Sequence, residues 1–140
     1  AKQHNHQIKG ELMNIALWIS QGILAVLFLF QGIVKFSPPP DLPASMAWTY
    51  DIPAGFSIFI GIVELLAVAG LLLPGITKIQ TRLTPLAATG LIFTMIGAII
   101  FHATRGEIAM IPGNIIWLLL SAFVAYGRWK LSPLQERQAN

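Results

Sequence analysis

The chain has 140 residues, of which 55% are hydrophobic and only 11% are charged. Soluble domains usually carry about 25% charged residues, so this composition excludes an ordinary water-soluble domain and indicates a membrane protein. There is no cysteine, which excludes disulfide frameworks, thiol redox relays and cysteine-ligated zinc or iron–sulfur sites, and we expect neither a metal nor an intrinsic cofactor.

Four apolar stretches of about 20 residues have the length that crosses a bilayer. The first ends at the three prolines at positions 38–40, which cannot continue a helix because proline lacks the backbone donor. The second opens after Asp51, a candidate N-cap, and ends before Pro74. The expected spans are residues 13–36, 53–73, 85–103 and 112–127, in a single membrane domain with polar tails at 1–11 and 131–140. Short connections then predict an all-α fold, an integral membrane antiparallel four-helix bundle.

The basic residues predict the orientation of this bundle. Hairpin topology places both termini and the loop at 75–83 on one side, together with Lys2, Lys9, Lys78, Arg82, Arg128, Lys130 and Arg137. Only Lys35 and Arg105 lie on the other side, so the positive-inside rule predicts cytoplasmic termini (N-in, C-in) in a bacterial or archaeal plasma membrane. Because a polar segment precedes the first span, we expect that helix to be retained rather than cleaved as a signal peptide.

The same charge distribution bears on partners. The cations are spread along the chain rather than massed in one patch, which argues against nucleic acid. The expected partners are the lipid bilayer and either other membrane subunits or a second copy of the chain.

Glu64 is the most informative residue. It lies 13 residues after Asp51, which is roughly 20 Å along a helix and close to the bilayer midplane. A carboxylate at that depth is unfavourable unless it faces the bundle and is either paired or protonated. Two interpretations stay open: a proton-exchanging or ligand-contacting group, and a structural hydrogen bond between helices.

Other polar residues lie near the outer ends of the spans. Lys35 shares a helix face with Gln31, and we expect it to extend toward the outer headgroups; the alternative is an inward anionic partner such as Asp41 or Asp51. His102 is expected to be an interfacial residue, with a proton donor or an axial ligand to a pigment or haem as the alternative.

Asn114 is expected to bond between helices rather than to bind substrate. Under the predicted topology, however, the outer third of the bundle collects Gln31, Lys35, Asp51, His102 and Asn114. These residues suggest an outer-side polar pocket with Glu64 at its floor.

Several short motifs are similar to those of a known family. They are Phe30-Gln31-Gly32 through Lys35-Phe36 in the first span, Gly61-Ile62-Val63-Glu64 and Leu71-Leu72-Leu73-Pro74-Gly75 in the second, His102 closing the third, and Ala125-Tyr126-Gly127-Arg128-Trp129 closing the fourth. Over residues 12–130 the chain resembles the DoxX-like family of small four-helix membrane proteins, named after a subunit of a thiosulfate-linked quinone-reducing complex. The resemblance implies a four-helix bundle, with Lys35, Glu64 and His102 as the positions that would contact a quinone headgroup or its protons.

Two functions of different classes follow. The one that the sequence favours is an accessory structural subunit of a larger respiratory, redox or photosynthetic membrane complex. The alternative is a quinone-associated redox subunit, in which Glu64 exchanges protons, Lys35 or His102 contacts the headgroup, and a quinone or lipid is shared with a partner. We do not expect an enzyme acting alone, because nothing in the chain supplies an electron carrier. A small-solute carrier is disfavoured because no inverted repeat or broken helix is evident.

Overall fold

The computed structural model describes residues 1–139, and these residues form helices and loops without a strand. The α-helices are α1 (Lys2–Val34), α2 (Ala54–Thr77), α3 (Leu83–Thr104) and α4 (Ile111–Tyr126). Short helical segments connect or end them: the 3-10 helices η1 (Ala44–Asp51) and η2 (Ile108–Met110), and the π-helical turn η3 (Gly127–Leu131). Four helices in this part of the chain are long and apolar enough to cross a membrane, so the predicted all-α membrane fold is confirmed.

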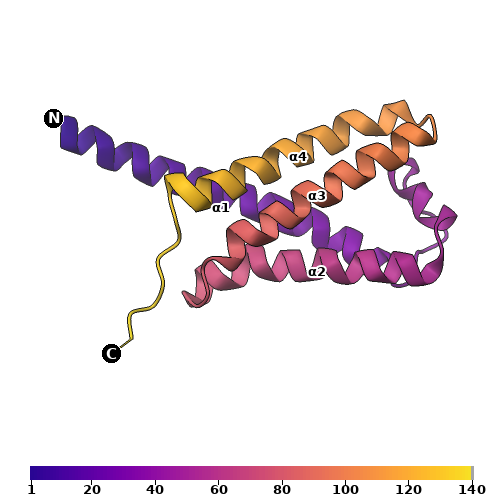
Figure 1. Cartoon of the computed structure of the whole chain (residues 1–140), viewed down its shortest axis with the longest axis horizontal. Helices are drawn as coiled ribbons and strands as arrows, with labels where there is room; N and C mark the ends of the chain where they lie inside the picture. The colour runs from indigo at the N-terminus through magenta and orange to yellow at the C-terminus, as the bar shows by residue number, and fades with distance from the viewer. Residues whose placement is uncertain (140) are drawn as a thin grey trace.

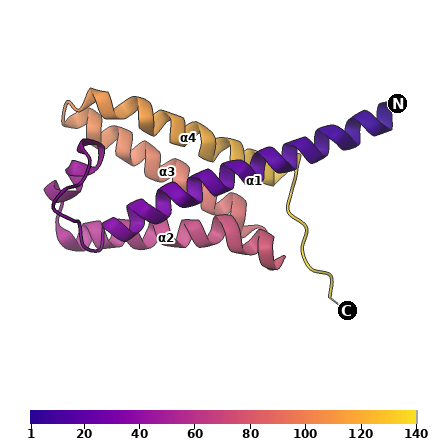
Figure 2. The ribbon, with the colours of Figure 1, turned by 180° about the vertical axis from the view of Figure 1, so that it is seen from behind.

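Successive helices run in opposite directions and pack as neighbours (Figure 1). The connections η1 and η2 lie together at one end, which we call the η1 end, and both termini lie toward the other (Figures 1 and 2). The order is therefore that of an antiparallel bundle. The cytoplasmic placement of the termini stays a prediction.

Helices α1 and α2 extend beyond the predicted spans by at least one helical turn. Helix α1 begins at Lys2, so most of the segment predicted as a polar tail continues the helix, and it projects beyond the bundle with residues 2–12 exposed (Figure 2). Lys, Gln and Glu in this segment are good helix formers, which explains the continuation. Helix α2 runs past Pro74 to Thr77. The carbonyl of Gly70, which Pro74 cannot satisfy, accepts a hydrogen bond from Thr84 Oγ1 at 2.8 Å.

The core lies between the four helices and contains Leu24, Phe28, Leu71, Leu91 and Val124, each fully buried. Many large apolar side chains on all four helices point outward instead; examples are Val26, Leu66, Phe93 and Leu119. In water such a surface would be strongly unfavourable, whereas lipid tails solvate it. The surface therefore fits a multi-pass membrane protein that meets lipid.

Candidate functional site

A close crossing of α1 and α2 sets up the most unusual feature of the molecule. A Cβ atom at Gly32 would lie 3.2 Å from the carbonyl oxygen of Gly61, and one at Gly61 would lie 2.8 Å from the carbonyl oxygen of Gly32. Glycine at both positions thus lets the two backbones touch. One turn further along each helix stand Lys35 and Glu64. Because helical side chains lean toward the N-terminus of their own helix, these two lean toward each other across antiparallel helices.

Lys35 and Glu64 form a buried ion pair. The Lys35 Nζ lies 2.9 Å from Oε2 and 3.1 Å from Oε1 of Glu64, and the residues are 1% and 2% exposed. The ammonium also lies 5.2 Å from the centre of the Trp48 ring, and Ser57 Oγ donates to the Lys35 carbonyl at 3.0 Å. The expectation that Lys35 extends to the headgroups is therefore wrong, and so are Asp41 and Asp51 as its partners. The Lys35 ammonium turns inward to Glu64 rather than outward to the headgroups because the two buried charges neutralise each other.

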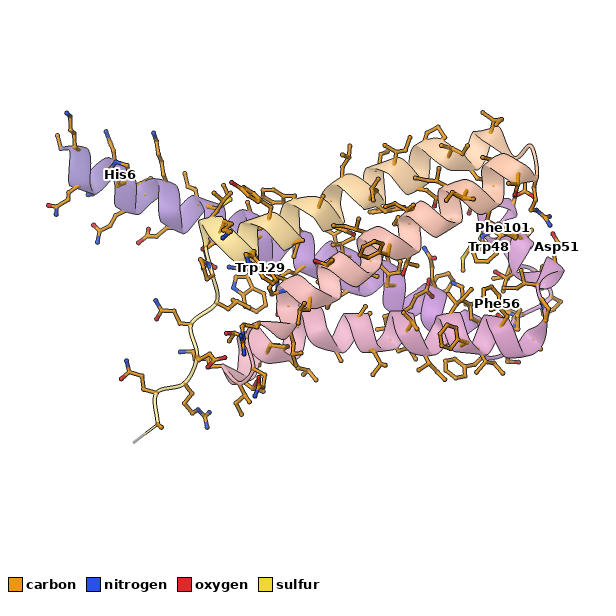
Figure 3. All side chains as sticks on the ribbon, in the orientation of Figure 1. His6, Trp48, Asp51, Phe56, Phe101 and Trp129 are labelled. Atoms are coloured by element: carbon orange, nitrogen blue, oxygen red, sulfur yellow. The ribbon has the colours of Figure 1, made fainter. Side chains whose placement is uncertain are left out.

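A cavity of about 700 Å³ opens beside this ion pair, between the helices and beneath η1. Its walls are mainly apolar and aromatic, with Phe30, Trp48, Phe56, Phe59, Phe101 and Trp117 among the lining residues. Figure 3 shows Trp48 and Phe101 at this end of the bundle, in the space between α2 and α3. Ligand pockets in proteins commonly measure about 300–1,000 Å³ and are mostly apolar with a few polar groups, so this cavity has the size and character of a binding site.

The cavity brings together four of the residues singled out in the sequence: Gln31, Glu64, His102 and Asn114 all line it. Lys35 is not among its lining residues, but its ammonium contacts two residues that are, Glu64 and Trp48. Asp51 is the last residue of η1 (Figure 3). Its carboxylate binds Arg105. Whether the four lining residues bind anything stays a prediction, but their convergence on one space is a fact of the geometry.

Asn114 brings an unused hydrogen-bond donor to the cavity. Its Nδ2 atom is buried and has no hydrogen-bond partner among residues 1–139. The expected bond from Asn114 to another helix is therefore not made through this atom. A buried donor without an acceptor is unfavourable by about 1–3 kcal/mol, and a ligand oxygen in the cavity would satisfy it.

His102 is held at the η1 end by a polar chain. Its Nδ1 lies 2.6 Å from Glu107 Oε2, Arg105 Nε donates to Glu107 Oε1 at 2.6 Å, and the Arg105 guanidinium binds Asp51 at 2.5 Å. The bonds to His102 and Arg105 hold the pKa of the Glu107 carboxyl below its usual range. The ring of His102 also contacts Trp48 and Phe101 edge to face, at centroid distances of 5.8 and 5.4 Å.

The turn after α3 places Glu107 over His102. Gly106 has a φ of +71°, the Gly106 N–H donates to the Ala103 carbonyl, and the Glu107 N–H donates to the His102 carbonyl at 2.9 Å. This is the glycine-dependent Schellman ending of a helix. The sequence pattern gave Glu107 no role. The glycine one residue earlier was the signal that the chain turns back at this point.

A second buried charge lies at the opposite end of the bundle. Arg128, in η3, is 2% exposed and donates to Gln21 Oε1 at 2.6 Å and Asn14 Oδ1 at 2.7 Å. Gln21 in turn donates to the Leu71 carbonyl at 2.6 Å, which joins α1 to α2. The sequence suggested only a topology signal for Arg128. The seven-residue spacing of Asn14 and Gln21 on α1 was the available clue to a buried partner.

No group of three or more His, Asp or Glu side chains in the described part of the chain is placed to hold a metal ion.

Comparison with known proteins identifies a family. The family model described as the DoxX-like family matches residues 19–124, which is most of the chain and includes α2, α3 and the cavity-lining part of α1. Neither a curated protein nor a solved structure matches the sequence.

Proposed function

We propose that this chain, which belongs to the DoxX-like family, binds a lipid-soluble molecule with an oxygen-bearing headgroup in the cavity at the η1 end. The chemical class that we propose is a quinone. The chain would hold it as a subunit of a larger membrane complex, whose other subunits supply the electron carriers.

The observation that carries this proposal is the cavity itself, with its volume of about 700 Å³. Aromatic and aliphatic side chains make up most of its wall, which suits an apolar ring and the start of a lipid tail. The polar groups that line it come from all four α-helices: Gln31 from α1, Glu64 from α2, His102 from α3 and Asn114 from α4. A molecule with carbonyl or hydroxyl oxygens on an apolar ring matches that distribution.

Each polar group has a definite task in the proposal. Asn114 Nδ2 donates a hydrogen bond to a ligand oxygen, which satisfies the donor that the protein leaves unpaired. His102 and Glu64 contact the headgroup, and Lys35 acts through Glu64 by neutralising its charge. The sequence-based role of Glu64 as a proton-exchanging group is not part of this proposal, because protonation of Glu64 would break its buried ion pair with Lys35.

Binding can be measured directly with decylubiquinone as the probe. Trp48 and Trp117 line the cavity, so a bound quinone should quench tryptophan fluorescence of the protein in lipid nanodiscs, in a saturable manner. Gly97 and Gly90 provide matched variants on α3, because a Cβ atom at either one meets nothing within 4 Å but only Gly97 lines the cavity. Gly97→Leu should weaken binding about tenfold or more, and Gly90→Leu should leave it unchanged. Unsaturable quenching, or equal binding by both variants, would contradict the proposal.

A second candidate is an accessory subunit without a ligand, which packs against a larger membrane complex. The large apolar side chains exposed along all four helices favour it, because a partner helix could cover them as well as lipid does. Gly97→Leu, which fills the cavity without breaking the buried ion pair, separates the two candidates when the host complex is purified in mild detergent. The quinone-associated role predicts that quinone-dependent turnover is lost while the complex stays assembled; the accessory role predicts unchanged turnover.

A further inference from the structure

We propose that Glu107 and His102 form a proton pathway between the water at the η1 end and the molecule in the cavity. This inference rests on the proposed function for the identity of the molecule that gives or takes the proton. The protonation path itself is a property of the protein alone, and it is testable without a ligand.

The imidazole ring of His102 lies between the cavity and Glu107, which is partly exposed at the η1 end. The imidazole of His102 lines the cavity, and its Nδ1 lies 2.6 Å from Glu107 Oε2. The other ring nitrogen, Nε2, makes no hydrogen bond to any residue between 1 and 139. The His102 side chain is 4% exposed, whereas that of Glu107 is 29% exposed. Glu107 therefore touches water, His102 touches the cavity, and a short hydrogen bond joins them.

Neighbouring residues fix the orientation of both the His102 ring and the Glu107 carboxylate. Trp48 and Phe101 pack edge to face on the His102 ring, which fixes its plane. The turn at Gly106 and the bond from Arg105 Nε fix the Glu107 carboxylate, and Asp51 holds Arg105 from η1. Arg105 and Asp51 are positioning residues in this arrangement.

The other charged groups near the cavity are already paired. Glu64 on α2 has both carboxylate oxygens on the Lys35 ammonium, so proton uptake by Glu64 would break a buried ion pair. On α4, Asn114 is the polar residue that lines the cavity, and it does not titrate. Gln31 of α1 is likewise neutral. His102 is thus the titratable residue that lines the cavity, has a ring nitrogen without a hydrogen-bond partner in residues 1–139 and is linked to water through Glu107.

Proton transfer along this pathway needs only the ligand, His102, Glu107 and water. For release, a ligand hydroxyl gives its proton to Nε2, the proton on Nδ1 passes to Glu107 Oε2, and Glu107 gives it to water. The ligand is left as its anion, and the histidine has changed from the Nδ1–H to the Nε2–H tautomer. For uptake, Glu107 takes a proton from water and passes it to Nδ1 as the Nε2 proton goes to the ligand anion. One cycle of uptake and release restores both residues.

The first experiment needs no ligand and uses the full chain in nanodiscs. A laser-induced pH jump changes the protonation of His102, and the contacting Trp48 ring reports it because imidazolium quenches indole fluorescence. His102→Gln identifies the signal. Glu107→Gln should slow the response about tenfold or more, measured at each protein's own titration midpoint. Asp41→Asn is the control, since it removes an exposed carboxylate at the same end that lies outside the polar chain.

The outcomes of this experiment decide the inference. A slower response in Glu107→Gln but not in Asp41→Asn supports it. Equal rates in the wild type and Glu107→Gln, equal slowing in both variants, or the same signal in His102→Gln as in the wild type would each overturn it. If circular dichroism shows that Glu107→Gln is unfolded, Glu107→Asp takes its place, and its rate should be intermediate.

A second experiment adds 2-hydroxy-1,4-naphthoquinone, whose absorption changes when its hydroxyl group loses a proton. After the pH jump, the bound dye should change protonation more slowly in Glu107→Gln than in the wild type, with its Kd unchanged. Failure of the dye to bind to the wild type would count against the proposed quinone site and leave the ligand-free result to decide the pathway. Binding with equal rates in both proteins would count against the pathway alone.

Discussion

Breaking the Lys35–Glu64 pair on one side should destabilise the protein far more than removing both charges. The Nζ atom lies 2.9 and 3.1 Å from the two carboxylate oxygens, and both residues are almost fully buried. At about 3 Å, and with an effective dielectric constant of about 20, the attraction is roughly 5 kcal/mol. Desolvation of the two ions opposes it by several kcal/mol each, so the intact pair contributes little net stability.

The variants follow from these magnitudes. Lys35→Met leaves a buried carboxylate and Glu64→Leu leaves a buried ammonium, and each should lower the free energy of unfolding by about 3–5 kcal/mol. The double variant restores neutrality with side chains of similar volume, and it should lose at most about 1 kcal/mol relative to the wild type. Asp51→Asn, which removes one member of an exposed ion pair, is the control and should change little.

Equilibrium unfolding in mixed micelles, followed by helical circular dichroism, measures the free energies of unfolding of the wild type, the two single variants, the double variant and the control. The double-mutant cycle should give a coupling energy of several kcal/mol. Single substitutions with only small effects, or a double variant whose loss equals the sum of the singles, would refute the buried ion pair.

Three more predictions test the elements that position the site. Gly32→Ala should destabilise the α1–α2 crossing in the same unfolding assay, because the new Cβ would lie 2.9 Å from the Leu65 side chain and 3.2 Å from the Gly61 carbonyl oxygen. Gly22→Ala on the same helix is the control. Its Cβ would meet nothing within 4 Å, so this variant should be neutral or slightly stabilising. Gly106→Ala should lower stability by about 1–2 kcal/mol, since φ is +71° and L-residues disfavour that region, and a thermal melt with no shift would show that the turn is not needed. Because the pKa of Glu107 is lowered in the folded protein, the bonds of its carboxylate stabilise the fold above the ordinary carboxyl pKa, and this stabilisation is lost as the pH falls through the lowered pKa. The fall of Tm on the acid side should therefore be shallower in Glu107→Gln than in the wild type. Parallel curves of Tm against pH for the two proteins would contradict this.

The helices were predictable because hydrophobicity alone determines them. Runs of apolar residues separated by prolines and charges gave the number, order and approximate ends of the spans. Boundaries were less certain: α2 continues through Pro74 because Thr84, from another helix, satisfies the carbonyl that the proline leaves open. No local pattern contains that information.

The site was predictable only in part. The depth of Glu64 required an inward-facing environment, and topology gathered Gln31, His102 and Asn114 at one end. The partner of Glu64 depended on the register between α1 and α2, which the contact of Gly32 with Gly61 sets. Trp48 and Glu107 lie in connections, whose course over the end of the bundle depends on tertiary packing and on one positive φ angle.

The most direct test of the proposed binding site is native mass spectrometry of the chain extracted in mild detergent. The wild type should carry a lipid-soluble molecule of defined mass, the Gly97→Leu variant should lose it, and the Gly90→Leu variant should keep it. A bare polypeptide in the wild type, or the same bound mass in Gly97→Leu, would contradict a ligand in the cavity.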